Sequence, residues 1–514
     1  MDLCDDQSET IAFLAGSQGL GTGGPVERID THAAIVFLTE TRAYKLKRAV
    51  RYPYLDFSST VKRKAVCEAE LALNRRTAPD LYLGVECVGR EAGGRLVLGG
   101  GEPVDWLVVM RRFPVDCLLD AIAHEGPLSP GLMRDLADEI ATFHAAAEVV
   151  PGFGADRVKA VIDGNRASMD ALPAGLLAPD QCEQLHRRSL AVLAELAALL
   201  DQRSMAGHVR HCHGDLHLAN ICLWNGRPTL FDCLEFDSGL ATTDVLYDLA
   251  FLVMDLWQRD LHAEASIVFN RYCDMHPPGA GLAAIGLFLS MRAAVRAHVH
   301  ASASARQKAA EHRKAEIQDA RTYLAAALGF LERHAPRLVA IGGLSGSGKS
   351  TLAGGLAPYI GDPPGARWLR TDVLRKRLAG VHPEAPLPPK AYTVERNHQI
   401  YRTLMDEAGD TLAAGMSVIV DGVFADPADR SAIAQITAGL GAPFHGLWLD
   451  APFEVLRARV STRQGDASDA DAAVVERQLR YDLGDLGGWQ RLHAQGSREN
   501  VLAQARALIE GTMP

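Results

Sequence analysis

The chain has 514 residues, of which 48% are hydrophobic and 23% are charged, and its formal net charge is −10. This length predicts two or three domains with separate cores, and this balance is typical of a globular protein rather than a disordered one. The acidic charge argues against general electrostatic binding of nucleic acid or of an anionic membrane, so we expect neither as a partner.

The cysteines and the hydropathy narrow the class of protein further. All nine cysteines lie between Cys4 and Cys273. An odd number in one part of a chain, without a signal peptide, indicates reduced thiols, and we therefore expect a cytoplasmic protein. No uninterrupted apolar run reaches the roughly 18 residues that would suggest a membrane-spanning helix.

The first part of the chain is predicted to be rich in strands. Strand-like stretches at 33–38 and 43–46 flank a short polar turn, a helix is expected over 61–76, and the apolar stretch 106–110 predicts another strand.

From residue 131 onward helical patterns dominate, for instance over 132–144 and 189–200. A hairpin interrupts them, because 220–223 and 228–231 flank a turn that contains Asn225-Gly226, a strong hairpin signal. A strand-rich lobe followed by a helical lobe is the outline of a two-lobed kinase.

Acidic and amide side chains are concentrated around this hairpin. His213-Gly214-Asp215 is followed by Asn220, and Asp232 comes just after the second strand. Phosphoryl transfer needs a carboxylate that orients and deprotonates the acceptor hydroxyl, together with oxygen ligands for Mg²⁺. The ordered set supplies both kinds of group.

The pattern HGDxxxxN, followed by a strand that ends in Asp, resembles the aminoglycoside phosphotransferase family, relatives of the protein kinases. The resemblance covers roughly residues 30–300. It implies a bilobal protein-kinase-like fold that binds ATP, with Asp215 as the catalytic base and with Asn220 and Asp232 as Mg²⁺ ligands.

This family also needs a strand lysine paired with a helix glutamate, which together fix the α- and β-phosphates of ATP. Lys45 and Lys47 compete for this role because they would share one strand face; we favour Lys45, with Lys47 as the alternative. Glu70 is the expected partner. Asp248 is expected to brace the catalytic loop.

Other polar side chains near the motif are less specific. Glu235 and Asp237 are either solvated loop carboxylates or contributors to metal or acceptor binding. A zinc site built from His211, Cys212, His213 and nearby cysteines is not expected, because adjacent ligands lack the spacing of zinc fingers.

A helix separates this region from the rest of the chain. Spaced apolar residues predict an amphipathic helix over 308–334, and Pro336 disfavours its continuation. The apolar stretch 338–341 then predicts a strand. We therefore place the boundary near residue 334, which divides the chain into domains 1–334 and 335–514.

A glycine-rich loop with the pattern GxxxxGKS follows this strand, and a helix is expected from about Thr351. Its glycines let backbone amides close round phosphate, the lysine reaches the β- and γ-phosphates, and the last serine would hold Mg²⁺. The segment is a predicted P-loop for a nucleoside triphosphate. Its candidate binding residues are Gly343, Ser345, Gly346, Ser347, Gly348, Lys349, Ser350 and Thr351.

Further candidates follow the P-loop. Asp372, three residues before Arg375, would place a carboxylate on the acceptor hydroxyl and a guanidinium on a phosphate; the alternative is an exposed helix start that Asp372 caps. Strand 417–421 ends in Asp421, the form of a Walker B strand that binds Mg²⁺. Arg459 and Arg463, four residues apart, are either part of a mobile arginine-bearing lid or a solvated basic face; we favour the lid.

The DxxR element, and Arg463 with Ser468-Asp469-Ala470, resemble the small P-loop kinases, the group of gluconate kinase and zeta-toxin. The resemblance implies a P-loop NTPase fold with a parallel sheet. The predicted fold class is therefore α/β and α+β in two domains, a bilobal protein-kinase-like fold followed by a P-loop fold.

Together these motifs predict a bifunctional kinase that uses ATP and Mg²⁺ and phosphorylates hydroxyls of small metabolites, of the sugar, aminosugar or cyclitol class. The alternatives are a chain with one catalytic half and one nucleotide-sensing half, and a non-catalytic ATP-dependent switch. A polynucleotide kinase is disfavoured by the acidic charge. The motifs specify no oligomeric state.

Overall fold

A computed structural model describes residues 5–16, 19–21, 24–52, 55–307, 309–462 and 467–511 of the chain. The chain divides into two compact units. The first unit comprises Met1–Gly152 and Ser204–Leu252, and the second comprises Phe153–Arg203 and Val253–Pro514. Residues 153–203 and 253–334 thus share a unit with the P-loop segment, and the predicted boundary at 334 stays a prediction.

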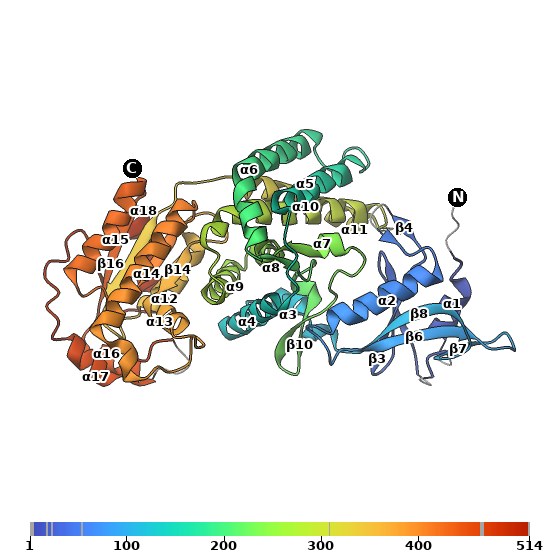
Figure 1. The fold of residues 1–514 in the computed structure, drawn as a ribbon, viewed down its shortest axis with the longest axis horizontal. Coiled ribbons are helices and arrows are strands. Elements are labelled where there is room, and N and C mark those ends of the chain that lie inside the picture. Colours follow the sequence, from blue (N-terminus) through green and yellow to red (C-terminus); the bar gives the residue numbers. More distant parts are fainter. Residues whose placement is uncertain are drawn as a thin grey trace. The chain divides into compact units, whose positions relative to one another are not determined.

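The first unit contains an antiparallel sheet in the order β1-β2-β3-β8-β6-β7. In Figure 1, helix α2 lies along this sheet. The predicted strands and helix are confirmed, with shifted ends. Its elements are α1 (Ser8–Ala15), β1 (Glu27–Asp30), β2 (Ala34–Leu38), β3 (Arg42–Lys47), β4 (Arg51–Tyr52), β5 (Leu55–Asp56), α2 (Thr60–Asn74), β6 (Tyr82–Arg90), β7 (Leu96–Leu98) and β8 (Glu102–Arg111).

Alternation along β3 decides which side chains meet α2. Tyr44 and Leu46 join the core on the α1 side of the sheet, whereas Ala43 joins the core on the α2 side with Cys67. Because successive strand side chains point to opposite faces, Lys45 and Lys47 share the face of Ala43, toward α2.

The rest of the first unit carries the HGD motif and the hairpin. At the hairpin turn Asn225 has φ 51° and Gly226 has φ 76°, the left-handed pair of a type I′ turn, so the predicted hairpin is confirmed. These elements are η1 (Val115–Cys117), α3 (Leu119–Glu125), α4 (Pro130–Ala146), β9 (Val209–His211), η2 (Leu218–Asn220), β10 (Ile221–Trp224), β11 (Arg227–Leu230), α7 (Ser238–Ala241) and β12 (Thr242–Asp244). The division between the units falls within α6 (Pro179–Met205) and α8 (Val245–Gln258).

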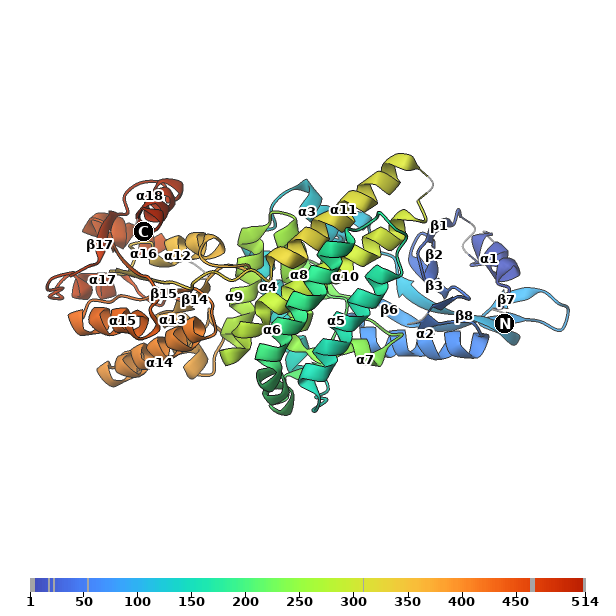
Figure 2. The ribbon, with the colours of Figure 1, turned by 90° about the horizontal axis from the view of Figure 1, so that it is seen from above.

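The second unit begins with a helical part. Its elements are α5 (Gly154–Asp170), most of α6, the end of α8, α9 (His262–Met275), η3 (Gly279–Ala284), α10 (Ile285–Ser304) and α11 (Ala310–Gly329). Helices α10 and α11 run side by side (Figure 2), and Ser290 Oγ of α10 donates a hydrogen bond to the carbonyl of Ala327 at 2.7 Å. By length and composition Gly279–Ser304 could cross a membrane, but 72% of its most apolar window is buried within the structure.

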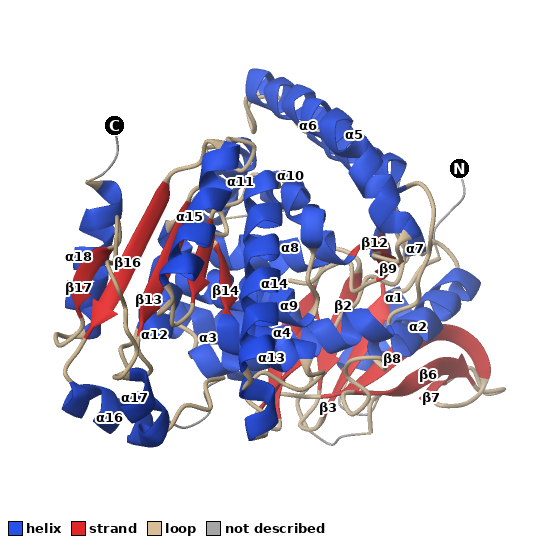
Figure 3. Ribbon diagram, turned by 60° about the vertical axis from the view of Figure 1, so that its left-hand side comes forward, coloured by secondary structure: helices blue, strands red, loops and turns tan. Residues whose placement is uncertain are grey.

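A five-stranded parallel sheet forms the remainder, in the order β14-β15-β13-β16-β17 (Figure 3). The short apolar run of β13 is buried on both faces, as expected of a central parallel strand. The strands are β13 (Leu338–Gly343), β14 (Arg367–Arg370), β15 (Val418–Asp421), β16 (Phe444–Asp450) and β17 (Gln490–His493).

Helices cover both faces of this sheet. Residues Val339 and Ile341 of β13 pack with α12 and α18, whereas Leu338 and Ala340 pack with α13, α14 and α15. The predicted combination of an α+β part and a parallel P-loop sheet is confirmed. The helices are α12 (Lys349–Leu356), η4 (Ala357–Tyr359), α13 (Thr371–Leu378), η5 (Pro389–Tyr392), α14 (Val394–Ala413), α15 (Pro427–Leu440), α16 (Phe453–Thr462), α17 (Ala472–Gln478) and α18 (Arg498–Glu510).

Candidate active sites

In the first unit, Asp215 lies between β9 and η2 with its carboxylate within reach of solvent. Its side chain is 40% exposed, and Asn220 Nδ2 donates hydrogen bonds to both its Oδ2 and its backbone carbonyl at 2.9 Å. His217 Nε2 is 3.5 Å from the same carboxylate. The short η2 turn therefore brings together two of the predicted residues and holds the carboxylate in one orientation.

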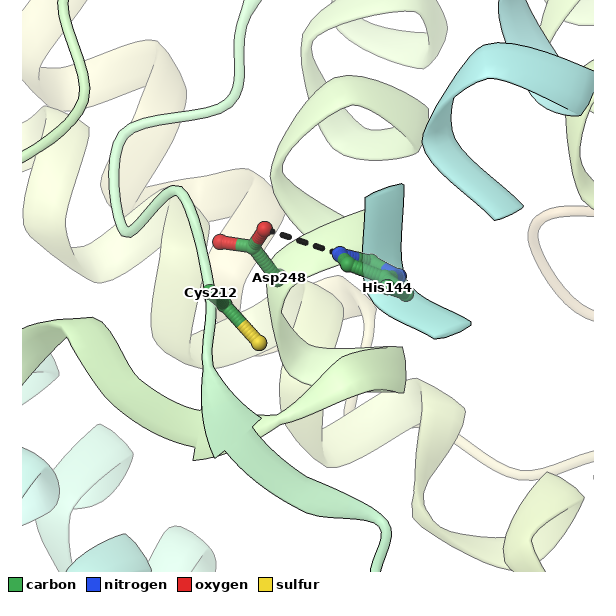
Figure 4. A group of neighbouring side chains, drawn as sticks. All are labelled: His144, Cys212 and Asp248. Atoms are coloured by element: carbon green, nitrogen blue, oxygen red, sulfur yellow. Dashed lines mark hydrogen bonds and ion pairs between the residues drawn. The ribbon is translucent and has the colours of Figure 1, made fainter. Parts of the chain in front are cut away.

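Asp248, at the start of α8, holds the backbone of this loop and pairs with His144 (Figure 4). Its fully buried carboxylate accepts hydrogen bonds from the backbone N–H groups of His213 at 3.1 Å and Gly214 at 2.8 Å, and it lies 3.1 Å from His144 Nε2. Gly214 has φ 83°, and a side chain there would meet Leu234. These contacts fit the expected bracing role of Asp248.

His144, Cys212 and Asp248 offer ligand atoms within 4.8 Å of one another, the spacing of a metal site. These side chains already have hydrogen-bond partners within the protein. Asp248 accepts from the backbone N–H groups of His213 and Gly214, and Cys212 Sγ donates to the carbonyl of Thr243 at 3.5 Å. The geometry is that of a hydrogen-bonded brace.

Both candidate lysines of β3 reach Glu70 of α2, which is completely buried. Lys45 Nζ lies 2.8 Å from Glu70 Oε1 and 2.5 Å from Asp232 Oδ1. Lys47 Nζ lies 2.5 Å from Glu70 Oε2 and also pairs with Glu235. Lys45 is therefore the lysine that joins Glu70 to Asp232, and Lys47 forms a second, deeper pair. The sequence analysis did not predict this ion pair between Glu235 and Lys47.

Opposite charges in this network stabilise the ionised forms of Glu70 and Lys45 against the effect of burial. Burial opposes the charge of Glu70, but the ammonium groups of Lys45 and Lys47 hold its pKa at about 2. Burial also opposes the charge of Lys45, yet Asp232 and Glu70 raise its pKa well above the usual value. Burial raises the pKa of Glu235 in spite of Lys47. The lysines and Glu70 are therefore charged at neutral pH.

The turn that carries Asp232 is held in a conformation that non-glycine residues disfavour, with φ 61°. Its backbone N–H donates to Tyr82 Oη at 3.1 Å, and the next N–H, of Cys233, donates to Asn74 Oδ1 at 2.8 Å. Contacts with the sheet and with α2 thus hold this turn in its strained conformation, as is common at sites where a side chain needs a fixed orientation. The side chain of Asp232 is 37% exposed, and carboxylate oxygens are ligands that Mg²⁺ takes.

In the second unit, the predicted P-loop joins β13 to α12. Its glycines at 343, 346 and 348 have φ values of 141°, 84° and 96°, which other residues rarely adopt. A Cβ on Gly346 would lie 2.6 Å from the carbonyl oxygen of Leu456. Lys349 Nζ donates to the carbonyl of Leu344 at 3.0 Å. The loop therefore has the left-handed backbone that a phosphate cradle requires.

Ser350 and Asp421 meet beside this loop, as expected of P-loop and Walker B residues. The Ser350 hydroxyl donates to Asp421 Oδ2 at 2.6 Å. Asp421 is 4% exposed, and its burial raises the pKa of its carboxyl, while Lys349 and Arg370 oppose the shift. A buried carboxylate and a hydroxyl at the end of a phosphate loop fit a Mg²⁺ site.

A cavity of about 1390 Å³ opens from this loop. It brings together most of the predicted residues of this half, and its wall includes Ser345 to Thr351, Asp372, Arg375, Asp421 and Arg459. Arg463 lies outside the described residues. Asp372 stands in the first turn of α13 and faces the cavity.

The two described arginines of the predicted set contact protein backbone. Arg459 donates to the carbonyls of Gly346 at 3.4 Å, Ser347 at 3.3 Å and Ala494 at 2.8 Å. Arg375 donates to the carbonyl of Ala391 at 2.8 Å and to Asn397 Oδ1 at 2.9 Å. Both therefore hold the cavity wall, and their predicted contacts with phosphate stay predictions.

Sequence reasoning missed Gln478 at this cavity, and it named Asp469 only for its resemblance, without a contact. Gln478 Oε1, on α17, accepts a hydrogen bond from the P-loop N–H of Ser345 at 2.8 Å. Asp469 pairs with the buried Lys376 at 2.6 Å and accepts hydrogen bonds from the Leu387 N–H at 3.1 Å and from the Tyr392 hydroxyl. No local pattern connects these residues, since their partners lie far away in the sequence.

Comparison with known proteins matches two parts of the chain to two different families. Residues 97–282 match the phosphotransferase enzyme family, and residues 338–482 match an AAA domain family. An uncharacterized protein of Mycobacterium tuberculosis is 29% identical over 495 residues, which cover 93% of this chain and 94% of that protein. This alignment spans both matched regions.

Solved structures are similar to parts of the chain. A choline/ethanolamine kinase family protein from Mesorhizobium loti is 17% identical and covers 62% of this chain and 98% of its own, with a TM-score of 0.38. A gluconokinase from Sinorhizobium meliloti is 19% identical and covers 35% and 97%, with a TM-score of 0.25. A sugar kinase from Janibacter sp. is 25% identical and covers 34% and 95%, with a TM-score of 0.27.

Both resemblances predicted from the sequence are confirmed by the family matches. The chain is a tandem of a phosphotransferase-like region and a small P-loop kinase-like region, and its domains indicate a nucleotide-binding phosphotransferase.

Proposed function

We propose that this protein is a bifunctional ATP-dependent kinase that phosphorylates hydroxyl groups of small metabolites of the sugar, aminosugar or cyclitol class. The observation that carries the proposal is that each unit gathers its own set of reactive side chains. Asp215, Asn220 and the Lys45–Glu70–Asp232 array lie in one unit, and the P-loop with Asp372 and Asp421 lies in the other.

In the first unit, Asp215 would accept the proton of the acceptor hydroxyl as its oxygen attacks the γ-phosphorus of ATP, and ADP would leave. The half-exposed carboxylate, held by Asn220, suits this role because it is oriented without being sealed from an acceptor. Lys45, held by Glu70, would bind the α- and β-phosphates.

In the second unit, the P-loop amides and Lys349 would bind the phosphates, and Asp372 would take the acceptor proton. Arg375 and Arg459 would support this reaction through the cavity walls that they hold. Mg²⁺, when bound, neutralises charge on the phosphates. Asn220 and Asp232 in one site, and Ser350 and Asp421 in the other, are the oxygen donors that would hold it.

Separate inactivation of the two sites tests the proposal. ADP release would be measured with Mg²⁺-ATP and a panel of sugars, aminosugars and cyclitols for the full chain, Asp215→Ala, Lys349→Ala and the double variant. We expect each single variant to lose phosphorylation of one set of acceptors, by about 10²–10⁴-fold, and to keep the other set. Loss of all activity in either single variant would rule out two independent sites.

The same experiment covers the alternatives. If Asp215→Ala leaves every acceptor phosphorylated, the first unit serves as a nucleotide-sensing module. If the full chain binds ATP by calorimetry yet releases no ADP with any acceptor, the chain is a non-catalytic switch.

A further inference from the structure

Helix α9 belongs to the region that matches the phosphotransferase family, yet it packs against the P-loop sheet of its own unit. Asn270 Nδ2 donates to the carbonyl of Ala366 at 3.1 Å, and its Oδ1 accepts from the Trp368 N–H at 2.7 Å. Strand β14 is at the edge of the sheet. The amide side chain therefore satisfies backbone groups that a neighbouring strand would otherwise pair.

Two arginine–carboxylate pairs fix this contact. Arg367 of β14 lies 2.5 Å from Asp274 of α9, and Arg271 of α9 forms two hydrogen bonds of 3.0 Å with Glu384. Arg271 is also 3.0 Å from His382 Nε2. Both arginines are less than a tenth exposed. Paired, desolvated guanidinium groups with two parallel hydrogen bonds set a specific geometry, and breaking such a pair is costly.

Glu384 lies in the segment 380–388, which joins α13 to η5. Lys376 of α13 is fully buried and donates to the carbonyl of Ala385 and to Asp469. The Leu387 N–H also donates to Asp469. Leu387 and Asp469 line the cavity at the P-loop. Contacts therefore run without interruption from Arg271 through the segment 380–388 to the cavity wall.

We propose that Arg271 is a positioning residue for the P-loop site: it holds the segment 380–388 and, through it, the part of the cavity wall that Leu387 and Asp469 form. Helix α9, which lies in the region that matches the phosphotransferase family, thereby supports the P-loop site. The kinetic part of the test rests on the proposed function of the P-loop site, whereas the structural part does not.

Hydrogen exchange by mass spectrometry on the full chain provides the structural test. We expect Arg271→Ala to raise exchange in 380–392 and 467–471 by about tenfold or more, because the tie to Glu384 is lost. Glu384→Gln should give the same pattern, and because the Glu384 side chain is 28% exposed, this variant tests the same pair without removing a fully buried side chain. Arg259→Ala, which removes the partner of Asp255 at 3.0 Å, is the matched control and should leave both segments unchanged.

The kinetic test uses an Asp215→Ala background, which removes the base of the first site but not its nucleotide binding, and measures kcat and KM for Mg²⁺-ATP hydrolysis at the P-loop site. We expect Arg271→Ala to lower kcat about tenfold while KM changes less than about twofold, since the P-loop itself is untouched. Arg271→Lys should recover part of the loss.

Two results would overturn the proposal. One is unchanged exchange in 380–392 and 467–471 in both Arg271→Ala and Glu384→Gln. The other is an equal response in Arg259→Ala. If the parent chain turns over no ATP with or without an acceptor, the proposed kinase function fails, and the exchange result alone decides the role of Arg271.

Discussion

In the first unit, the candidate site joins charged side chains from β3, from α2 and from the turn after β11, whereas in the second unit its centre is the continuous segment 343–350 between β13 and α12. The first site depends on buried ion pairs between distant segments. The second depends on the backbone conformation of glycines that are neighbours in the sequence. The first should therefore be sensitive to loss of a charge, and the second to addition of a Cβ atom.

The largest expected effect tests the ion pairs of the first site. Lys47→Met leaves Glu235 without its partner and Glu70 with one lysine instead of two. We expect the free energy of unfolding of the first unit to fall by about 3–5 kcal/mol, measured by urea denaturation. Lys62→Met, which removes a half-exposed lysine paired with Asp56 at 2.7 Å, is the control and should cost about 1 kcal/mol or less. Equal losses in the two variants would contradict the importance of the buried network.

The next effect tests the backbone of the second site. Gly346→Ala places a Cβ 2.6 Å from the carbonyl oxygen of Leu456 at φ 84°, so the loop must shift. We expect KM for Mg²⁺-ATP hydrolysis at this site to rise about 100-fold, measured in an Asp215→Ala background that removes the base of the first site. Gly415→Ala isolates the cost of conformation alone, because Gly415 has φ 82° with open space around its would-be Cβ. If both variants bind nucleotide equally well, the close packing of Gly346 is not what shapes the loop.

A smaller effect tests whether Arg459 acts on the loop or on the reaction. Because Arg459 donates to the carbonyls of Gly346, Ser347 and Ala494, Arg459→Ala should weaken nucleotide binding about tenfold and change kcat less than KM. Arg457→Ala, on the exposed face of the same helix, should match the parent protein. A fall confined to kcat would instead place Arg459 on the transferred phosphoryl group.

The smallest effect is a contrast in pH dependence between the two sites. The pKa of Glu70 is depressed to about 2, so its pairs stabilise the fold above about pH 4.5 and lose that contribution as the pH falls toward 2. The pKa of Asp421 is raised by burial, so its cost to stability decreases as acid protonates it.

Urea denaturation between pH 7 and pH 4 would measure this contrast. Relative to the parent chain, Asp421→Asn should be most stabilising at pH 7, and its advantage should shrink as the pH falls. Glu70→Gln should be destabilising across the range, with its deficit shrinking only at the acid end. Parallel pH profiles for the two variants would show that the sites do not differ in this way.

Features that depend on short stretches of sequence were predictable. The Asn225-Gly226 turn, the apolar run of β13 and the glycines of the P-loop each encode a backbone conformation, because φ preferences and strand burial act over a few residues. The alternation along β3 also placed Lys45 and Lys47 on one face, although it did not say which lysine would reach Asp232.

Only the tertiary structure decided the long-range partners. The pairing of Lys47 with Glu235, the contact of Gln478 with Ser345, and the tie between Arg271 and Glu384 join residues that are more than a hundred positions apart. A side chain carries no local mark of the distant group that will bury it, since desolvation and charge pairing arise only when the segments pack. The sequence thus determined the reactive motifs and the phosphate loop, and packing determined which charged side chains hold them in place.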